Sequence, residues 1–129
     1  MRIPTPIPRL HARPAPSHGT LPRPVQDKPE RFLFLLLDRF TMIAFASAIE
    51  PLRLANQVSG QKLYEWALVS EDGQDVTCSN GVTMRVDMGL GEVGRDDTVI
   101  VCGGIDVVEA TSKPVLNWLR REARRGAAV

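Results

Sequence analysis

The segment Arg31–Asn56, RFLFLLLDRFTMIAFASAIEPLRLAN, decides the fold of this chain. Its opening run, Arg31–Leu37, is almost entirely apolar. Such a run is typical of a strand buried on both faces of a parallel sheet, although periodicity alone also allows a buried helical segment. After Asp38-Arg39 the apolar residues recur every three or four positions, which predicts an amphipathic helix with Thr41 as its N-cap. A buried strand that leads into such a helix is the first half of a βαβ unit.

The rest of the chain supplies the elements that complete this unit. Pro51 is expected to kink or end the first helix, and Ser59-Gly60 to stop what continues beyond it. The further elements are a strand at Leu63–Ser70, a small edge hairpin at Val76–Asp87 that turns at Asn80-Gly81, a strand at Asp97–Cys102, a helix capped by Ser112 with Pro114 in its first turn, and an incipient strand at Ala127–Val129.

Composition divides the chain into two regions. Residues 1–30 are rich in proline and arginine and have little apolar periodicity, so we expect a disordered tail. Residues 31–129 form the folded domain, which is slightly acidic and gives no electrostatic argument for nucleic-acid binding. No apolar stretch is long enough to span a membrane, and we expect a cytoplasmic protein.

The catalytic and metal-binding residue types are sparse. Both histidines, His11 and His18, lie in the predicted tail, so the folded part has no Ser-His pair, Cys-His pair or zinc site that needs histidine. Cys78 and Cys102 lack a C-x-x-C spacing, and buried free thiols are the interpretation we favour.

A Gly-Gly pair, Gly103-Gly104, follows the strand at Asp97–Cys102. Ligands of open parallel sheets bind beyond the carboxyl ends of the strands, and glycines there let the backbone approach a ligand. A plain tight turn explains the pair equally well. The pattern is neither G-x-G-x-x-G nor a Walker loop, so we assign no nucleotide, no other cofactor and no metal.

Four arginines crowd the end of the last helix: Arg120, Arg121, Arg124 and Arg125. They allow a nucleic-acid contact, but a helix C-terminus also favours cations through its dipole, and we favour that second explanation.

The phrases FASAIEPLRLAN, YEWALVSEDGQDV, SNGVTM and DTVIVCGG closely resemble the N-terminal part of GlxA-type regulators of the AraC family, in particular the subgroup associated with carnitine and glycine-betaine catabolism. The resemblance covers about residues 32–129. It implies a PfpI-like (class I glutamine amidotransferase-like) ligand-sensing domain with a flavodoxin-like α/β fold: an open, mostly parallel sheet with helices on both faces, here incomplete at its C-terminus.

The resemblance also implies a site and its departures from the enzymes of the superfamily. A ligand pocket would lie at the strand ends, lined by residues near Asp38–Thr41, Ala44 and Gly103–Asp106, with Phe40, Ala44, Gly103, Gly104 and Asp106 as the binding residues. For a quaternary ammonium ligand Phe45 and Trp66 are further candidates. The enzymes carry a cysteine that would follow Val129, and beside it an acidic residue where this chain has Ala44. A methyl group exchanges no proton, so we expect a binding domain and no enzyme.

Three hypotheses remain open at this stage. The first is the small-molecule-sensing domain of a DNA-binding regulator, which would contact DNA only through a C-terminal helix-turn-helix domain absent from this chain; a homodimer stays open. The second is a PfpI-like hydrolase or glyoxalase, for which Cys102 is the available thiol. The third is a truncated fragment without activity, because the chain stops early in a strand.

Overall fold

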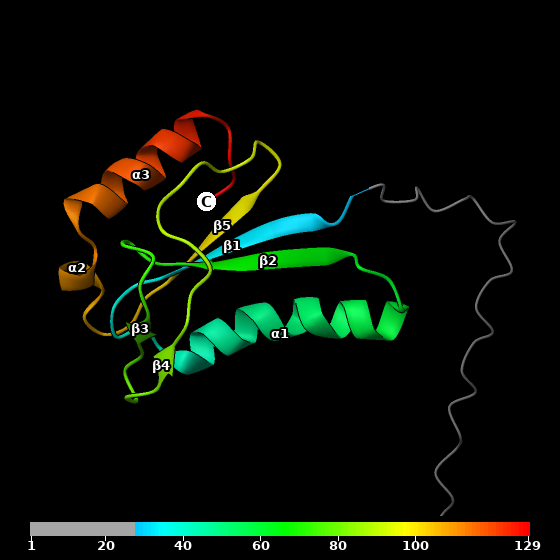
Figure 1. Ribbon diagram of the computed structural model, residues 1–129, viewed down its shortest axis with the longest axis horizontal. Helices are drawn as coiled ribbons and strands as arrows, with labels where there is room; N and C mark the ends of the chain where they lie inside the picture. Colours follow the sequence, from blue (N-terminus) through cyan, green and yellow to red (C-terminus); the bar gives the residue numbers. More distant parts are fainter. Residues whose placement is uncertain (1–27) are drawn as a thin grey trace, which may run out of the picture.

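A computed structural model describes residues 28–129, and most of the predicted tail lies outside the described residues. Figure 1 shows a sheet with helices on both faces. The elements are, in chain order, β1 (Glu30–Leu36), α1 (Met42–Ser59), β2 (Tyr64–Val69), β3 (Val76–Thr77), β4 (Thr83–Met84), β5 (Thr98–Cys102), α2 (Val107–Ala110) and α3 (Lys113–Arg124).

The central strand is β1, as its continuous apolar run predicts. The strand order is β2-β1-β5, and β1 is parallel to both neighbours. Phe34 stands opposite Leu68 on one side and Ile100 on the other. Because the strands are parallel, the loops that follow β1, β2 and β5 all emerge at the same edge of the sheet.

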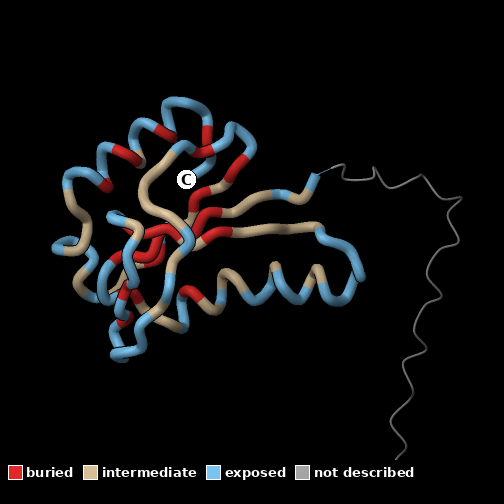
Figure 2. Tube along the Cα trace, in the orientation of Figure 1, coloured by how far each residue is buried: buried red, intermediate tan, exposed pale blue. Residues whose placement is uncertain are grey.

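Alternate side chains of β1 pack into two separate cores. Figure 2 shows in red the buried segments of the strands and of α3. Leu33, Leu35 and Leu37 face α3, where they pack with Val115 and Trp118. The other face of β1 packs against α1 and the β3–β4 hairpin. The buried residues of this second core are Phe34, Leu36, Phe40, Phe45, Val76, Cys78 and Cys102. The result is the three-layer α/β arrangement predicted for the domain.

The first helix, α1, continues through Pro51 to Ser59, so the proline does not end it. A kink at Pro51 stays a prediction. The helix ends where predicted, at Gly60, whose φ of 68° is left-handed. The side chain of Asn56 then joins helix to strand, because it accepts hydrogen bonds from the backbone of Leu63 and Tyr64 and donates one to the carbonyl of Tyr64.

The second half of the chain follows the predicted order with one addition. The strands β3 and β4 form a short antiparallel hairpin. Helix α3 starts at a genuine cap, since Ser112 accepts a hydrogen bond from the backbone of Val115. Ala128 pairs in parallel with Thr98 of β5, as the apolar end of the sequence suggested. The four-residue helix α2 was not predicted.

Candidate functional site

The turn between β1 and α1 is held in an unusual conformation. Arg39 has a φ of 60°, which lies in the left-handed region that residues other than glycine rarely adopt. Its N–H donates to the carbonyl of Thr77 at 2.9 Å, which fixes the turn to the β3–β4 hairpin. The N–H of Thr41 donates to the carbonyl of Gly103 at 3.0 Å, which fixes the same turn to the end of β5. Three loops therefore meet around Arg39.

Gly104 lies against this turn so closely that it has no room for a side chain. A Cβ on Gly104 would lie below 3.0 Å from the carbonyl oxygen of Arg39, which is a backbone atom. A Cβ on Gly103 would come too close only to the side chain of Val107, because its other neighbour, Leu37, lies at an ordinary contact distance. The Gly-Gly pair thus allows the loop after β5 to pack onto the loop after β1, and this packing positions α2.

An ion pair crosses the same junction. Nη1 of Arg39 lies 2.8 Å from Oδ2 of Asp106, the N-cap residue of α2. The two side chains are 60% and 38% exposed, so solvent weakens the pair. Arg39 is nevertheless the only basic residue that lines either of the two hollows at this edge of the sheet within residues 28–129.

We call the larger hollow the acidic cleft. It measures about 480 Å³ and lies at the carboxyl ends of β1 and β2, lined by Leu36, Leu37, Asp38, Ser70, Glu71, Asp72, Asp75, Val76 and Ala110. A second hollow of about 370 Å³ shares Asp38 and Ala110 with it and adds Arg39, Asp106 and Glu109. The carboxylates thus come from the loops after all three strands of the sheet. Among the described residues, no group of three or more Asp, Glu, Cys or His side chains is arranged to hold a metal ion.

The carboxylates of the acidic cleft differ in how firmly they are held. Oδ1 of Asp72 accepts a hydrogen bond from the backbone of Gln74 and is within reach of the Ser70 hydroxyl, so it shapes the turn. Asp38, Glu71 and Asp75 are exposed and have no hydrogen bond or ion pair to another described residue. These three side chains are therefore available to a ligand.

The residues predicted for the pocket fall into two groups. Gly103, Gly104 and Asp106 lie together at the junction beside the acidic cleft, and Ala44 lies exposed in the first turn of α1. Phe40 is fully buried, with its ring edge-on to Phe45 at a centroid distance of 5.9 Å. Phe45 and Trp66 belong to the same core cluster. The aromatic candidates thus serve packing in this structure.

The acidic residues of the loop after β2 were missed by the sequence interpretation. The segment Glu71–Asp75 carries three carboxylates directly after a buried strand, and no site was predicted there. The rule that ligands bind at strand ends, applied to β2 as it was to β5, would have found them.

The two cysteines have the properties of core residues. Cys78 and Cys102 are buried and free, as predicted. Burial raises the pKa of the Cys102 thiol to about 11, which leaves it protonated at neutral pH. An activated nucleophile needs the opposite shift, so Cys102 is not poised for catalysis.

The fold is that of the DJ-1 and ThiJ/PfpI proteins. A ThiJ/PfpI family protein from Pseudomonas syringae superposes with a TM-score of 0.57 at 17% identity, over 93% of this chain and 47% of that one. A DJ-1 superfamily protein from Agrobacterium tumefaciens gives a TM-score of 0.53 at 20% identity, over 76% and 50% of the two chains. An AraC family transcriptional regulator from Pseudomonas putida matches better, with a TM-score of 0.62 and 27% identity over 77% and 53%.

Within this class the chain is homologous to bacterial transcriptional regulators. It is 43% identical over 103 residues to the HTH-type transcriptional regulator GbdR of Pseudomonas aeruginosa, which covers 80% of this chain and 28% of GbdR. It is 37% identical to the HTH-type regulator CdhR of the same species, over 76% of this chain and 29% of CdhR. GlxA of Rhizobium meliloti is 33% identical, over 78% and 31%. No family model matches the sequence.

The resemblance to GlxA-type, AraC-family regulators with a PfpI-like domain is thereby confirmed. The chain spans about 28% of the length of GbdR. The related curated proteins are named as transcriptional regulators. No helix among residues 28–129 is long and apolar enough to cross a membrane.

Proposed function

We propose that residues 31–129 are the small-molecule-sensing part of a DNA-binding transcriptional regulator, and that the acidic cleft takes a quaternary ammonium metabolite such as carnitine or glycine betaine. The homology to HTH-type regulators supports the first half of the proposal. In the whole protein, a helix-turn-helix domain outside this chain would contact the DNA. The cleft at the strand ends supports the second half, because this edge is where open parallel sheets bind ligands.

The charge of the cleft carries the choice of ligand. Four of its nine lining residues are acidic (Asp38, Glu71, Asp72 and Asp75), and none is basic. A carboxylate about 5 Å from a cation contributes on the order of 1 kcal/mol in water, and more where the ligand displaces water. Three unpaired carboxylates therefore favour a cation over an anion by a few kcal/mol in sum.

Arg39 provides the complementary group for a zwitterion. Carnitine and glycine betaine carry a carboxylate besides the ammonium group, and Arg39 lies where the two hollows meet at Asp38. Its guanidinium presents five donors, of which the ion pair with Asp106 uses only one side. The ammonium group would face Asp38 and Asp75 while the carboxylate faces Arg39. Gly103, Gly104 and Asp106 would then hold Arg39 in place and touch the ligand little.

Ala44 fits a domain that binds without catalysis. It occupies the position where the resemblance places the acidic residue of the superfamily enzymes, and it lies exposed near the junction. A methyl group there can line a pocket but cannot transfer a proton.

The proposal is tested by calorimetric titration of the chain with glycine betaine and, separately, with carnitine, which measures the affinity for each ligand. Replacing Asp38→Asn together with Asp75→Asn removes two unpaired carboxylates and should weaken binding by about tenfold or more. The matched control is Glu92→Gln with Asp96→Asn, which removes the same charge from exposed residues outside the acidic cleft. Equal affinity in the two variants, or no binding to the unmodified chain, would refute the ligand assignment.

A further inference from the structure

The outer surface of α3 is strongly basic. Arg120, Arg121, Arg124 and Arg125 lie on two successive turns and are all exposed. Residues four apart on a helix lie on one face, so Arg120 with Arg124 and Arg121 with Arg125 form two rows. Within each row the two residues are about 6 Å apart along the axis. The one acidic residue of this helix, Glu122, is fully buried beneath them.

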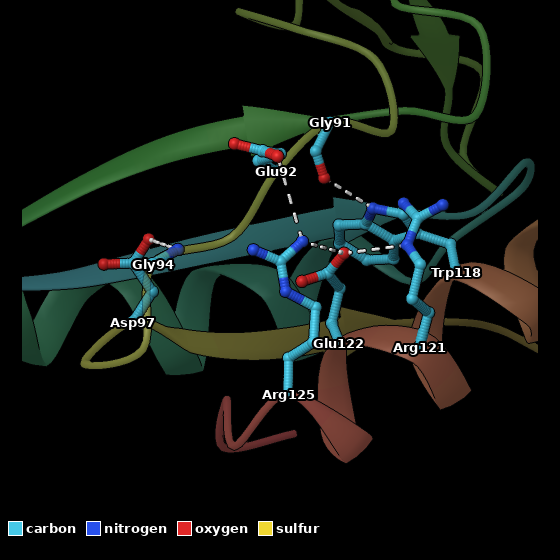
Figure 3. Close-up of polar contacts among 8 residues, drawn as sticks. All are labelled: Gly91, Glu92, Gly94, Asp97, Trp118, Arg121, Glu122 and Arg125. Carbon is cyan, nitrogen blue, oxygen red and sulfur yellow. Dashed lines mark hydrogen bonds and ion pairs between the residues drawn. The ribbon is translucent and has the colours of Figure 1, made fainter.

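The two rows differ in their partners. Oε1 of Glu122 lies 3.1 Å from Nε of Arg121 and 3.9 Å from Nη1 of Arg125, which also lies 3.9 Å from Glu92 (Figure 3). Within residues 28–129, Arg120 and Arg124 form no ion pair or hydrogen bond through their side chains, and the same holds for Arg95. Three guanidinium groups therefore lie unneutralised on this side of the molecule.

These arginines line two shallow hollows. One, of about 430 Å³, is lined by Asn117 and the four arginines alone. The other, of about 610 Å³, is lined by Glu92, Val93, Gly94, Arg95, Arg124, Arg125 and Ala127. The two share Arg124 and Arg125, so Arg95 and Arg120 extend one continuous basic surface. We call the set of Arg95, Arg120, Arg121, Arg124 and Arg125 the basic face.

The slightly acidic net charge of the domain does not reveal this basic surface. The acidic cleft collects its carboxylates at the carboxyl ends of the strands, whereas the basic face lies beside the loop that precedes β5, at the opposite edge of the sheet. Net charge therefore says little about the local potential at α3, because the two groups of charges are separated across the domain.

We propose that the basic face contacts the phosphate backbone of duplex DNA. Guanidinium groups bind phosphate through paired donors, and the basic face uses arginine throughout. Asn117 beside it adds donors of the kind that bind phosphate, and the hollow it lines has no apolar residue, as expected of a contact to a polyanion rather than to a protein core. The choice of DNA rests on the proposed role as part of a DNA-binding regulator. The contact would add affinity without reading sequence, because phosphates carry no base information.

The test is binding of the 129-residue chain to a fluorescein-labelled 25-base-pair duplex, followed by anisotropy as KCl is raised. The reversal Arg120→Glu with Arg124→Glu should weaken binding by about tenfold or more, and should make the slope of log K against log [KCl] shallower by about 2. The unmodified chain and the variant share the arginines of the N-terminal region, which are Arg2, Arg9, Arg13 and Arg23. The difference in DNA affinity between the two proteins therefore isolates the basic face.

The matched control is Lys28→Glu with Arg85→Glu, which imposes the same charge change at exposed residues that line neither basic hollow. An equal loss in this control would mean that only net charge matters and would overturn the proposal. So would tighter binding to polyglutamate than to DNA, which would assign the basic face to an acidic protein. The neutral pair Arg120→Gln with Arg124→Gln removes the same two contacts and should make the slope shallower by a similar amount, so it serves if the reversal disturbs folding. A failed betaine titration with intact DNA binding would reject the ligand assignment while the basic face stands.

Discussion

Gly104→Ala is expected to loosen the junction on which the acidic cleft is built. The added methyl group would enter the space of the Arg39 carbonyl, below 3.0 Å. That carbonyl cannot swing away freely, because the Arg39 N–H is bound to Thr77 at 2.9 Å and the Thr41 N–H is bound to Gly103 at 3.0 Å. The obstacle is backbone that is held from two sides, which places the overpacking cost at about 2–3 kcal/mol.

One opposing effect reduces this cost. Alanine restricts the unfolded chain more than glycine does, which returns about 0.4–1 kcal/mol. The net loss is then about 1–2.6 kcal/mol, which lowers the Tm of a domain of this size by roughly 4–21 °C. Gly103→Ala is the matched control, because its methyl group comes too close only to the side chain of Val107, which is 41% exposed on the short helix α2 and able to give way.

The assay is thermal unfolding of the 129-residue chain followed by circular dichroism at one fixed scan rate. Gly104→Ala should melt clearly below the unmodified chain, and Gly103→Ala should lie between the two. A Tm of Gly104→Ala within about 2 °C of the unmodified chain, or one above that of Gly103→Ala, would refute the close packing of the two loops.

Two further predictions concern the frame around the site. Asn56→Ala removes three hydrogen bonds between α1 and the start of β2 and should lower the free energy of unfolding in urea by about 2 kcal/mol. Asn56→Asp keeps the acceptor for the Leu63 and Tyr64 N–H groups and should lower it less. Equal losses in the two variants would contradict this role of Asn56. Burial raises the pKa of Cys102 from 9.0 to about 11, so its contribution to stability is complete below pH 9 and is lost as the pH rises toward 11. Cys102→Ala should flatten this part of the pH profile of unfolding, and an unchanged slope would contradict the assignment.

The central strand could be predicted because the pattern that specifies it is local. The apolar run at Arg31–Leu37 has no alternation, and only a strand covered on both faces hides all of it, which is how β1 lies. Pro51 does not end α1, since a helix that is packed along one face tolerates one missing hydrogen bond. Helix α2 was not predicted because its four residues are too few to show the periodic spacing of apolar residues that indicates a helix.

The site was only partly predictable because it is assembled from three loops. Strand ends point to Gly103, Gly104 and Asp106, which the structure brings beside Arg39. That Asp38 joins Glu71 and Asp75 in one cleft depends on β2 lying next to β1, which no local pattern specifies. The direction of an aromatic ring after a turn is equally undetermined by sequence, and Phe40 turns into the core.

The two charged surfaces of the domain are too far apart to influence each other by charge alone. The acidic cleft and the basic face lie at opposite ends of the sheet, and the seven residues of β1 span about 23 Å. That is nearly three Debye lengths at physiological ionic strength, where the screening length is about 8 Å. A ligand that neutralises Asp38 or Asp75 therefore leaves the potential at Arg120 and Arg124 almost unchanged. Any coupling between the two ends has to pass through packed elements, and the element that joins them is α3, which follows α2 at the cleft and ends at the basic face.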